Sequence, residues 1–149
     1  MRAYSAAGSG AVGADKTLVT MVSAATIRPA IYDIVIGCAA TPGDSATKFV
    51  VQRFTAAGTP GSSVTPEPID PADPAALASS GSGVFSVEPT YTASKILQVI
   101  SLNQRAAFRW IAAPGFEFKA LATAASGIGV KSSTATGQAV HDCNISWIE

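Results

Sequence analysis

The chain has 149 residues, and its ten Lys and Arg balance its ten Asp and Glu, so the formal net charge is zero. Charged residues make up 13% of the sequence, well below the usual share of ~25%, and 29 Ser and Thr supply much of the polarity instead. These values predict one folded domain, oppose a dedicated nucleic-acid binder, and leave no apolar run near the ~18 residues that a membrane span requires.

The first 16 residues are predicted to form an extended N-terminal arm. Residues 5–14 contain only Ser, Ala, Gly and Val, with no hydrophobic periodicity. Small residues in such a pattern are typical of flexible segments, so we expect the arm to be ordered only against a partner. Residues 17–149 are then expected to form a single β-sandwich domain.

Eight strand-like runs follow the arm. Each is rich in β-branched or aromatic residues and is bounded by turn-forming residues. The last run is the clearest, because Cys143, Ile145 and Trp147 alternate with mostly polar neighbours. The run 95–102 also fits a helical face, but its shortness and its β-branched residues favour a strand. The runs are 17–26, 31–38, 47–55, 84–88, 95–102, 105–112, 116–123 and 140–148.

The stretch 56–83 is predicted to be a long loop with a binding or covering role. Pro66, Pro68 and Pro71 exclude a central strand there, and loops of this length are uncommon unless they are functional. Asp73 is expected to cap a helical turn over 74–79. Further along, the pair of glycines in 127–129 is interpreted as a bend between strands.

These elements predict an all-β protein, an antiparallel two-sheet β-sandwich that is jelly-roll-like. Within it, alternation along the run 31–38 places Tyr32, Ile34 and Ile36 on one face and Ile31 on the other. Cys38 and Cys143 both lie in strand-like runs and are interpreted as small buried thiols. A disulfide between them stays open as an alternative.

The sequence does not indicate catalytic or metal-binding chemistry. His141 is the single histidine, and no nucleophile elbow, phosphate-binding loop or two-histidine metal motif accompanies it. Glu88, Glu117 and Asp142 supply carboxylates, but nothing in the sequence pairs two of them. We therefore expect a protein that is not an enzyme and that uses no cofactor.

Five residues are candidates for an interface with another protein. Arginine is enriched where carboxylates or aromatic rings are met across an interface. In an alternating strand over 105–112, Arg105 and Arg109 would share one face, opposite the aromatic side chains. Pairing of these arginines with acidic residues of the same chain explains them equally well. The candidate interface residues are Arg2, Tyr4, Arg53, Arg105 and Arg109.

Several runs of the sequence resemble a family of small virion proteins of tailed bacteriophages. The resemblance extends in order over roughly residues 15–149. The runs are Arg28-Pro-Ala-Ile-Tyr-Asp-Ile-Val-Ile-Gly37, Gln52-Arg-Phe-Thr-Ala-Ala-Gly-Thr59, Asp70-Pro-Ala-Asp-Pro74, Glu88-Pro-Thr-Tyr-Thr92, Asn103-Gln-Arg-Ala-Ala-Phe-Arg-Trp110 and Ala112-Ala-Pro-Gly115.

This resemblance implies a capsid decoration, or cement, protein. Such proteins are typically β-sandwiches that sit as homotrimers on the outer surface of a phage head. The implied partners are the major capsid protein and further copies of this chain, with no nucleic acid and no membrane. The implied location is the virion, after synthesis in the host cytoplasm. No catalytic residue is carried over from the family.

A carbohydrate-binding module for host recognition is the alternative function, because jelly rolls often serve as lectin domains. Such a module needs exposed aromatic rings against which a sugar can stack. The candidates for this role are Tyr4, Tyr32, Tyr91 and Trp147.

Overall fold

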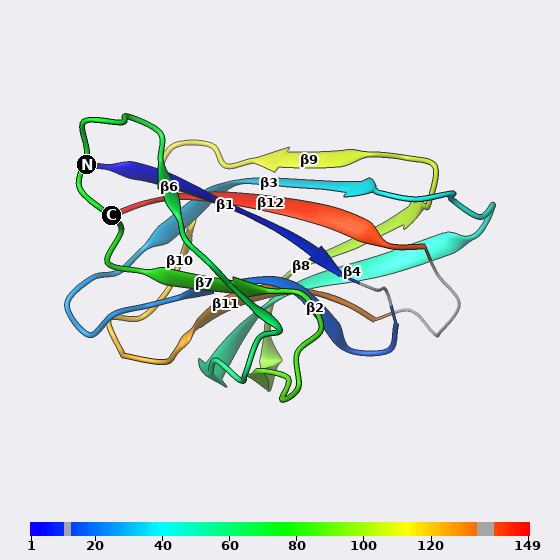
Figure 1. Cartoon of the computed structure of the whole chain (residues 1–149), viewed down its shortest axis with the longest axis horizontal. Coiled ribbons are helices and arrows are strands. Elements are labelled where there is room, and N and C mark those ends of the chain that lie inside the picture. The colour runs from blue at the N-terminus through cyan, green and yellow to red at the C-terminus, as the bar shows by residue number, and fades with distance from the viewer. Residues whose placement is uncertain (11–12, 134–138) are drawn as a thin grey trace.

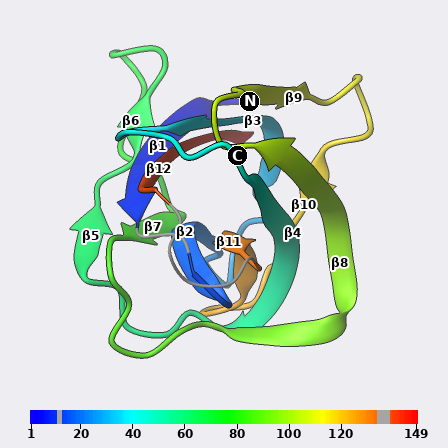
Figure 2. The ribbon, with the colours of Figure 1, turned by 90° about the vertical axis from the view of Figure 1, so that its right-hand side faces the viewer.

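The computed structural model describes residues 1–10, 13–133 and 139–149. They form an all-β protein in which two antiparallel six-stranded sheets pack face to face as a sandwich (Figures 1 and 2). The predicted two-sheet antiparallel architecture is therefore confirmed. The described residues contain no helix of the length and apolarity that a membrane crossing needs.

The first sheet contains β1 (Ala3–Gly10), β3 (Ala30–Cys38), β6 (Glu67–Pro68), β9 (Phe108–Ile111), β10 (Phe118–Lys119) and β12 (His141–Ile148). Its order is β10-β3-β12-β1-β6, and β9 also pairs with β3. The second sheet contains β2 (Lys16–Val22), β4 (Ala46–Ala56), β5 (Ser62–Val64), β7 (Ser79–Ser82), β8 (Thr90–Asn103) and β11 (Gly127–Ser132). Its order is β5-β7-β2-β11-β4-β8.

The core lies between the inner faces of the two sheets. Alternation along β12 buries Cys143, Ile145 and Trp147, as the sequence pattern predicted. In the first sheet, the Trp147 ring lies 6.3 Å from the Tyr4 ring, centroid to centroid. On the second sheet, Phe49 contributes to the same core. Large side chains from both sheets thus make one continuous apolar layer.

The expected alternation in β3 is correct for Ile34 and Ile36 but wrong for Ile31. All three side chains are buried, whereas Tyr32 is half-buried. The pairing of β3 with β12 shifts register between Ser146 and Trp147, opposite the start of β3. A β-bulge of this kind resets which residues face inward, and strict alternation cannot anticipate it.

The expected arm is corrected by the structure, because most of it is a strand of the first sheet. β1 pairs with β12 over its whole length, from Ala3 opposite Ile148 to Gly10 opposite His141, and with β6 on its other side. The segment is extended, as predicted, but it is ordered by its own chain rather than by a partner. Residues 11 and 12 of the predicted arm lie outside the described residues.

The stretch 56–83 is not one loop, since β5, β6 and β7 lie within it. Pro68 is tolerated because β6 is the last strand in its sheet order, where a missing N–H is harmless. β7 contains no proline and lies between β5 and β2. No helical turn forms over 74–79. Asp70 instead accepts a hydrogen bond from the Ala72 N–H at 2.9 Å and so stabilises a turn at residues 70–73, which precede the predicted helical turn.

The predictions for the part of the chain after residue 83 were confirmed in some segments and wrong in others. The run 95–102 lies inside β8 and is a strand, as favoured. The run 84–88 forms only a single bridge, between Val87 and Thr59. The glycines of 127–129 are part of β11, a central strand, not a bend. Tyr91 explains one of them, because a Cβ on Gly129 would lie 2.3 Å from the Tyr91 hydroxyl oxygen.

Candidate interaction surface

Arg109 is paired within the chain. Its Nε and Nη2 donate to the two carboxylate oxygens of Asp33 at 3.1 and 2.7 Å, across the β9–β3 pair. This bidentate contact raises the pKa of Arg109, first through the hydrogen bonds and then through the charge of Asp33. Of the two explanations that the sequence left open, the structure supports pairing within the chain for this residue.

Arg105 does not share a strand with Arg109, because β9 begins only at Phe108. Arg105 lies in the turn after β8, where its backbone N–H donates to the Asn103 side chain at 3.0 Å. Its side chain is exposed and forms no ion pair with the described residues. The predicted alternation does hold inside β9, where Phe108 and Trp110 pack against the core.

Arg2 and Tyr4 have different surroundings although they are near neighbours in sequence. Arg2 is exposed, and its Nε lies 3.6 Å from an Asp73 carboxylate oxygen. Tyr4 is 1% exposed, and its hydroxyl donates to the Pro74 carbonyl at 3.0 Å. The structure thus places Tyr4 in the core, where its side chain is covered by its own chain.

Arg53 points between the two sheets at one end of the sandwich. It shares the inner face of β4 with the core residues Phe49 and Val51, and its Nη1 donates to the Lys119 carbonyl of β10. Burial, and then the nearby charge of Arg28, lower the pKa of Arg53. Among the described residues it has no acidic partner.

β8 presents an open sheet edge. It is the last strand in the order of the second sheet, so among the described residues it has a strand neighbour on one side only (Figure 2). It is 14 residues long, and Ile96 and Val99 are 50% and 51% exposed. From Ile96 to its end the strand carries no charge and no proline. Charged side chains and proline are devices by which natural sheets usually protect an edge, so this part of β8 lacks both of them.

Exposed apolar side chains are concentrated in the part of the chain that includes β8. Twelve large hydrophobic residues are exposed among those described, and seven of them lie between residues 84 and 121. Single exposed apolar residues are normal on a protein surface, but two of these, Ile96 and Val99, lie on the strand that has the open edge. The seven are Val84, Val87, Ile96, Val99, Ile111, Phe116 and Leu121.

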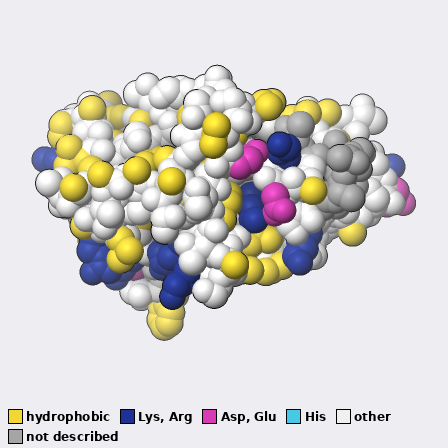
Figure 3. All heavy atoms as spheres, turned by 90° about the horizontal axis from the view of Figure 1, so that it is seen from below, with side chains coloured by type: hydrophobic (Ala, Val, Ile, Leu, Met, Phe, Trp, Pro, Cys, Tyr) yellow, Lys and Arg dark blue, Asp and Glu magenta, His cyan; other side chains and the backbone are white. Residues whose placement is uncertain are grey.

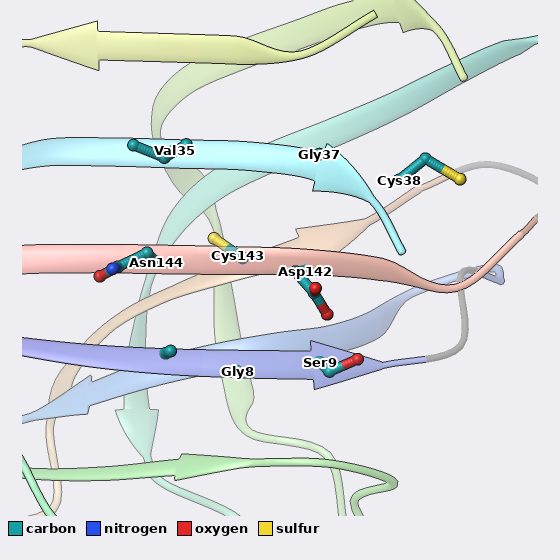
Figure 4. Close-up of a pocket in the computed structure, with 9 residues that line it drawn as sticks. Gly8, Ser9, Val35, Gly37, Cys38, Asp142, Cys143 and Asn144 are labelled. Atoms are coloured by element: carbon teal, nitrogen blue, oxygen red, sulfur yellow. The ribbon is translucent and has the colours of Figure 1, made fainter. Parts of the chain in front are cut away.

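A shallow hollow of about 470 Å³ lies on the outer face of the first sheet, over β1, β3 and β12. Figure 4 shows the Asp142 and Ser9 side chains there beside Gly8 and Gly37. The small residues leave the backbone close to the surface. Asn144, which also lines it, already accepts a hydrogen bond from the Ser5 hydroxyl at 2.9 Å. The hollow is shallow and combines these few oxygen atoms with small apolar residues such as Ala7 and Val35.

The residues considered for catalysis are kept apart by their separate contacts. His141 is fully buried against the Phe49 ring, and its Nδ1 lies 2.9 Å from the Ala139 carbonyl oxygen. Glu88 contacts Lys16 and the Thr17 N–H, whereas Glu117 accepts a bond from the Gly115 N–H. Within the described ranges there is no group of three or more His, Cys, Asp or Glu that could hold a metal ion.

The cysteines are both free thiols. Cys143 is buried, as predicted, and burial raises its pKa. Cys38 is half-buried, and its thiol donates to the Ala40 carbonyl at 3.3 Å. The register sets Cys143 opposite Ile36 and Cys38 opposite His141, so the two cysteines are not cross-strand partners.

The aromatic residues considered for sugar binding are largely enclosed. Tyr4 and Trp147 are in the core. The Tyr91 ring lies under the Lys131 ammonium, 4.8 Å from the ring centroid, and its hydroxyl is 2.9 Å from the Thr17 hydroxyl. Tyr32 is half-buried. Stacking a sugar needs an open ring face, and three of these four rings are covered.

The open β8 edge was not predicted, because strand order depends on pairings between distant segments. A signal was present in the uncharged run from residue 96 to 103, but such a run equally fits a central strand.

Comparisons of the chain with protein-family models, with curated proteins and with solved structures found no match.

Proposed function

We propose that this protein is a capsid decoration (cement) protein of a tailed bacteriophage, which assembles as a homotrimer on the outer surface of the phage head. The observation that carries the proposal is the open edge of β8, which has no charge from Ile96 to Asn103 and includes the half-exposed Ile96 and Val99. An edge segment without charge or proline invites pairing with another chain. In the proposed trimer, the β8 edge and its exposed apolar side chains lie in contacts with neighbouring copies.

We further propose that the sandwich is a jelly roll. The orders β1-β12-β3-β9 and β2-β11-β4-β8 support this assignment, because two interleaved Greek keys pair their strands in this way. Jelly rolls occur in viral capsid proteins, and this fold-level analogy agrees with the sequence resemblance to phage virion proteins. The analogy alone carries no function, so the β8 edge remains the main support.

The low charge of the chain supports contact with protein rather than with nucleic acid. Among the described residues, five ion pairs form within the chain, such as the one between Lys131 and Asp15 at 2.8 Å. Contacts with a shell would then rest on apolar and backbone groups. We assign the stretch 56–83, whose prolines stiffen it, to the broad contact with the major capsid protein.

The mass of the protein in solution and its binding to shells test this function. Sedimentation equilibrium is expected to give about three times the chain mass of 15.1 kDa. Purified protein is expected to bind to phage heads that lack it and to raise their resistance to heating. A monomer without affinity for such heads would refute the proposal.

A lysine on the open edge separates assembly from folding. Val99→Lys places a charge on the β8 edge and is expected to give a folded monomer, because a buried unpaired charge at a contact is costly. Leu77→Lys, at a residue that is 60% exposed and outside β8, is the matched control and should remain trimeric. If both variants keep the trimer, β8 is not in its contacts.

A further inference from the structure

A pocket opens where β8 separates from β4. Tyr91 of β8 lies opposite Phe54, and Ile96 lies opposite Gln52, so the four residues 92–95 span the stretch that Arg53 alone spans on β4. Such a bulge lifts the longer strand away from its neighbour. The Gln52 side chain bridges the gap by donating to the Thr92 carbonyl at 2.7 Å. Figure 2 shows the resulting bend in β8.

The pocket has a volume of about 390 Å³ and combines apolar walls with two cations. Phe54 is buried in it, and Leu121, which is 62% exposed, stands at its side. Arg53 and Lys95 supply the charges. The remaining lining residues are Thr55, Thr92, Ser126 and Gly127.

The turn that closes the pocket has an unusual backbone. Ala125, directly before Ser126, has a φ of 62°, in the left-handed region that residues with a Cβ rarely adopt. Its conformation is held by the Ser126 N–H and hydroxyl, which both donate to the Thr123 carbonyl, at 3.2 and 2.7 Å. Backbone strain of this kind is frequently found beside binding sites.

The positive charge at this end of the sandwich is not balanced. Arg53, Arg28 and Lys95 form no ion pair with the described residues. The charge that most perturbs Arg53 is that of another cation, Arg28. Figure 3 shows several Lys and Arg side chains at the lower left of one face, and others near the middle beside the prominent acidic side chains. A half-buried guanidinium beside a second cation favours an anion as ligand.

We propose that this pocket binds a carboxylate attached to an apolar group. Arg53 has further N–H groups beyond the one that it donates to the Lys119 carbonyl, and they can hold the carboxylate. Lys95 adds a second charge at the rim. The apolar part of the ligand then lies against Phe54 and Leu121. The assignment rests on this pocket alone and does not depend on the proposed function.

The chemistry of the walls favours a carboxylate over a phosphate. A phosphate would need most of its oxygen atoms satisfied by hydrogen bonds, whereas much of this lining is apolar. A carboxylate concentrates its charge at one end and leaves the rest of the ligand for the apolar walls. Two sources share this chemistry, a free aliphatic acid and an acidic side chain that is flanked by apolar residues in a polypeptide.

Hexanoate is the probe for the shared chemistry, with hexanol as the uncharged control. In a titration followed by amide NMR, hexanoate is expected to shift the signals of Thr92, Ser126 and Gly127, and to bind about tenfold more tightly than hexanol. The affinity should fall as salt is added, because the rim charges are screened. Equal affinity for hexanol, or a stronger response to inorganic phosphate, would overturn the assignment.

Charge variants locate the binding energy. Arg53→Gln is expected to weaken hexanoate about tenfold, and Lys95→Gln by about two- to threefold. Arg105→Gln, which removes an exposed arginine outside the pocket, is the control and should change nothing. Since Arg53 also contacts β10, the exposed Lys95→Gln keeps the test valid if Arg53→Gln does not fold. Unchanged binding in Lys95→Gln across the salt series would then refute the assignment.

A peptide arm distinguishes the two sources of the carboxylate. A short peptide with one Glu between two Leu residues is titrated beside hexanoate, together with its Gln counterpart. Tighter binding of the Glu peptide, at the same amides, assigns the site to a polypeptide partner. Tighter binding of hexanoate assigns it to a free acid. Binding of neither above the level of its neutral control refutes the proposal.

Discussion

Strands β1 and β8 have opposite compositions and opposite surroundings. β1 consists of Ala, Ser, Gly and one Tyr, yet it is paired on both sides, with β12 and β6. β8 carries Ile, Leu and Val over its second half, yet it lies at the end of its sheet with two of these side chains half-exposed. In this protein, the position of a strand in the topology decides its burial more than its mean hydropathy does.

The small residues of β1 allow the two sheets to approach each other. A Cβ on Gly8 would lie 2.5 Å from the Leu18 carbonyl oxygen and 2.8 Å from Cβ of Val19, both on β2. The Ser9 N–H also reaches across to the Ser82 hydroxyl of β7 at 3.0 Å. β1 is therefore fitted to its own chain, whereas β8 keeps the features of a surface made for another chain.

The largest effect is expected at the one large side chain of β1. Tyr4→Ala removes a buried ring beside Trp147 and should lower the free energy of unfolding by about 3–5 kcal/mol, measured by urea denaturation. Tyr4→Phe loses only the hydrogen bond to Pro74 and should cost about 1 kcal/mol. A small loss for Tyr4→Ala would mean that the Tyr4 ring does not anchor β1 in the core.

The close approach at Gly8 gives the next largest effect. Gly8→Ala must displace backbone and core atoms, so we expect a loss of about 1–3 kcal/mol in the free energy of unfolding. Gly37→Ala, on β3 of the same sheet, is the matched control, since nothing lies within 4 Å of the added Cβ. Equal unfolding midpoints for the two variants would show that the sheets do not meet closely at β1.

Tyr91 lies at the covered end of β8, under the Lys131 ammonium and beside the Thr17 hydroxyl. Burial raises the pKa of Tyr91 above the ordinary 10.0, although its bond with Thr17 acts in the other direction. The resulting stability is fully present below about pH 10 and is lost above it, because the unfolded chain releases the phenol proton first. Tyr91→Phe should cost about 1 kcal/mol at neutral pH and flatten this alkaline decline. Unfolding curves across alkaline pH measure both effects, and an unchanged decline would contradict the assignment.

The smallest effect on folding is expected at the open half of β8. Val99→Thr leaves a half-exposed residue of similar shape, so the free energy of unfolding of the isolated subunit should change by less than about 0.5 kcal/mol. The same variant should weaken self-association measurably by sedimentation. A large loss of folding stability would instead indicate that Val99 is part of the core.

Strict alternation made the sandwich and several of its strands predictable, and β12 is the clearest case. β1 was missed because Ala, Ser and Gly have little strand preference of their own, and β11 was missed because its two glycines were interpreted as a bend. Gly8 and Gly129 are required by what lies across from them, Leu18 in one case and Tyr91 in the other, and no local pattern contains that information. Conversely, the β-branched run at 84–88 lacked a neighbouring strand and formed a single bridge.

The candidate site was predictable in part. Alternation correctly separated Arg109 from Phe108 and Trp110, but it could not show that Asp33 is its partner, which depends on the β3–β9 pairing. The expected strand at Arg105 was wrong because Asn103 stabilises a turn there. The pocket at Arg53 arises from unequal numbers of residues on β4 and β8, a feature of pairing that is invisible before the strands are aligned.

The pairing of β1 with β12 has a consequence for how the protein folds. Ala3 meets Ile148 and Gly10 meets His141, so β1 leaves the ribosome long before its partner strand is made. Sequence separations this large slow folding, and an apolar strand that waits unpaired is prone to aggregate. Because seven of its eight residues are Ala, Ser or Gly, β1 can remain in water during synthesis with little tendency to aggregate. Its composition therefore suits the order of synthesis as well as the packing of the finished sandwich.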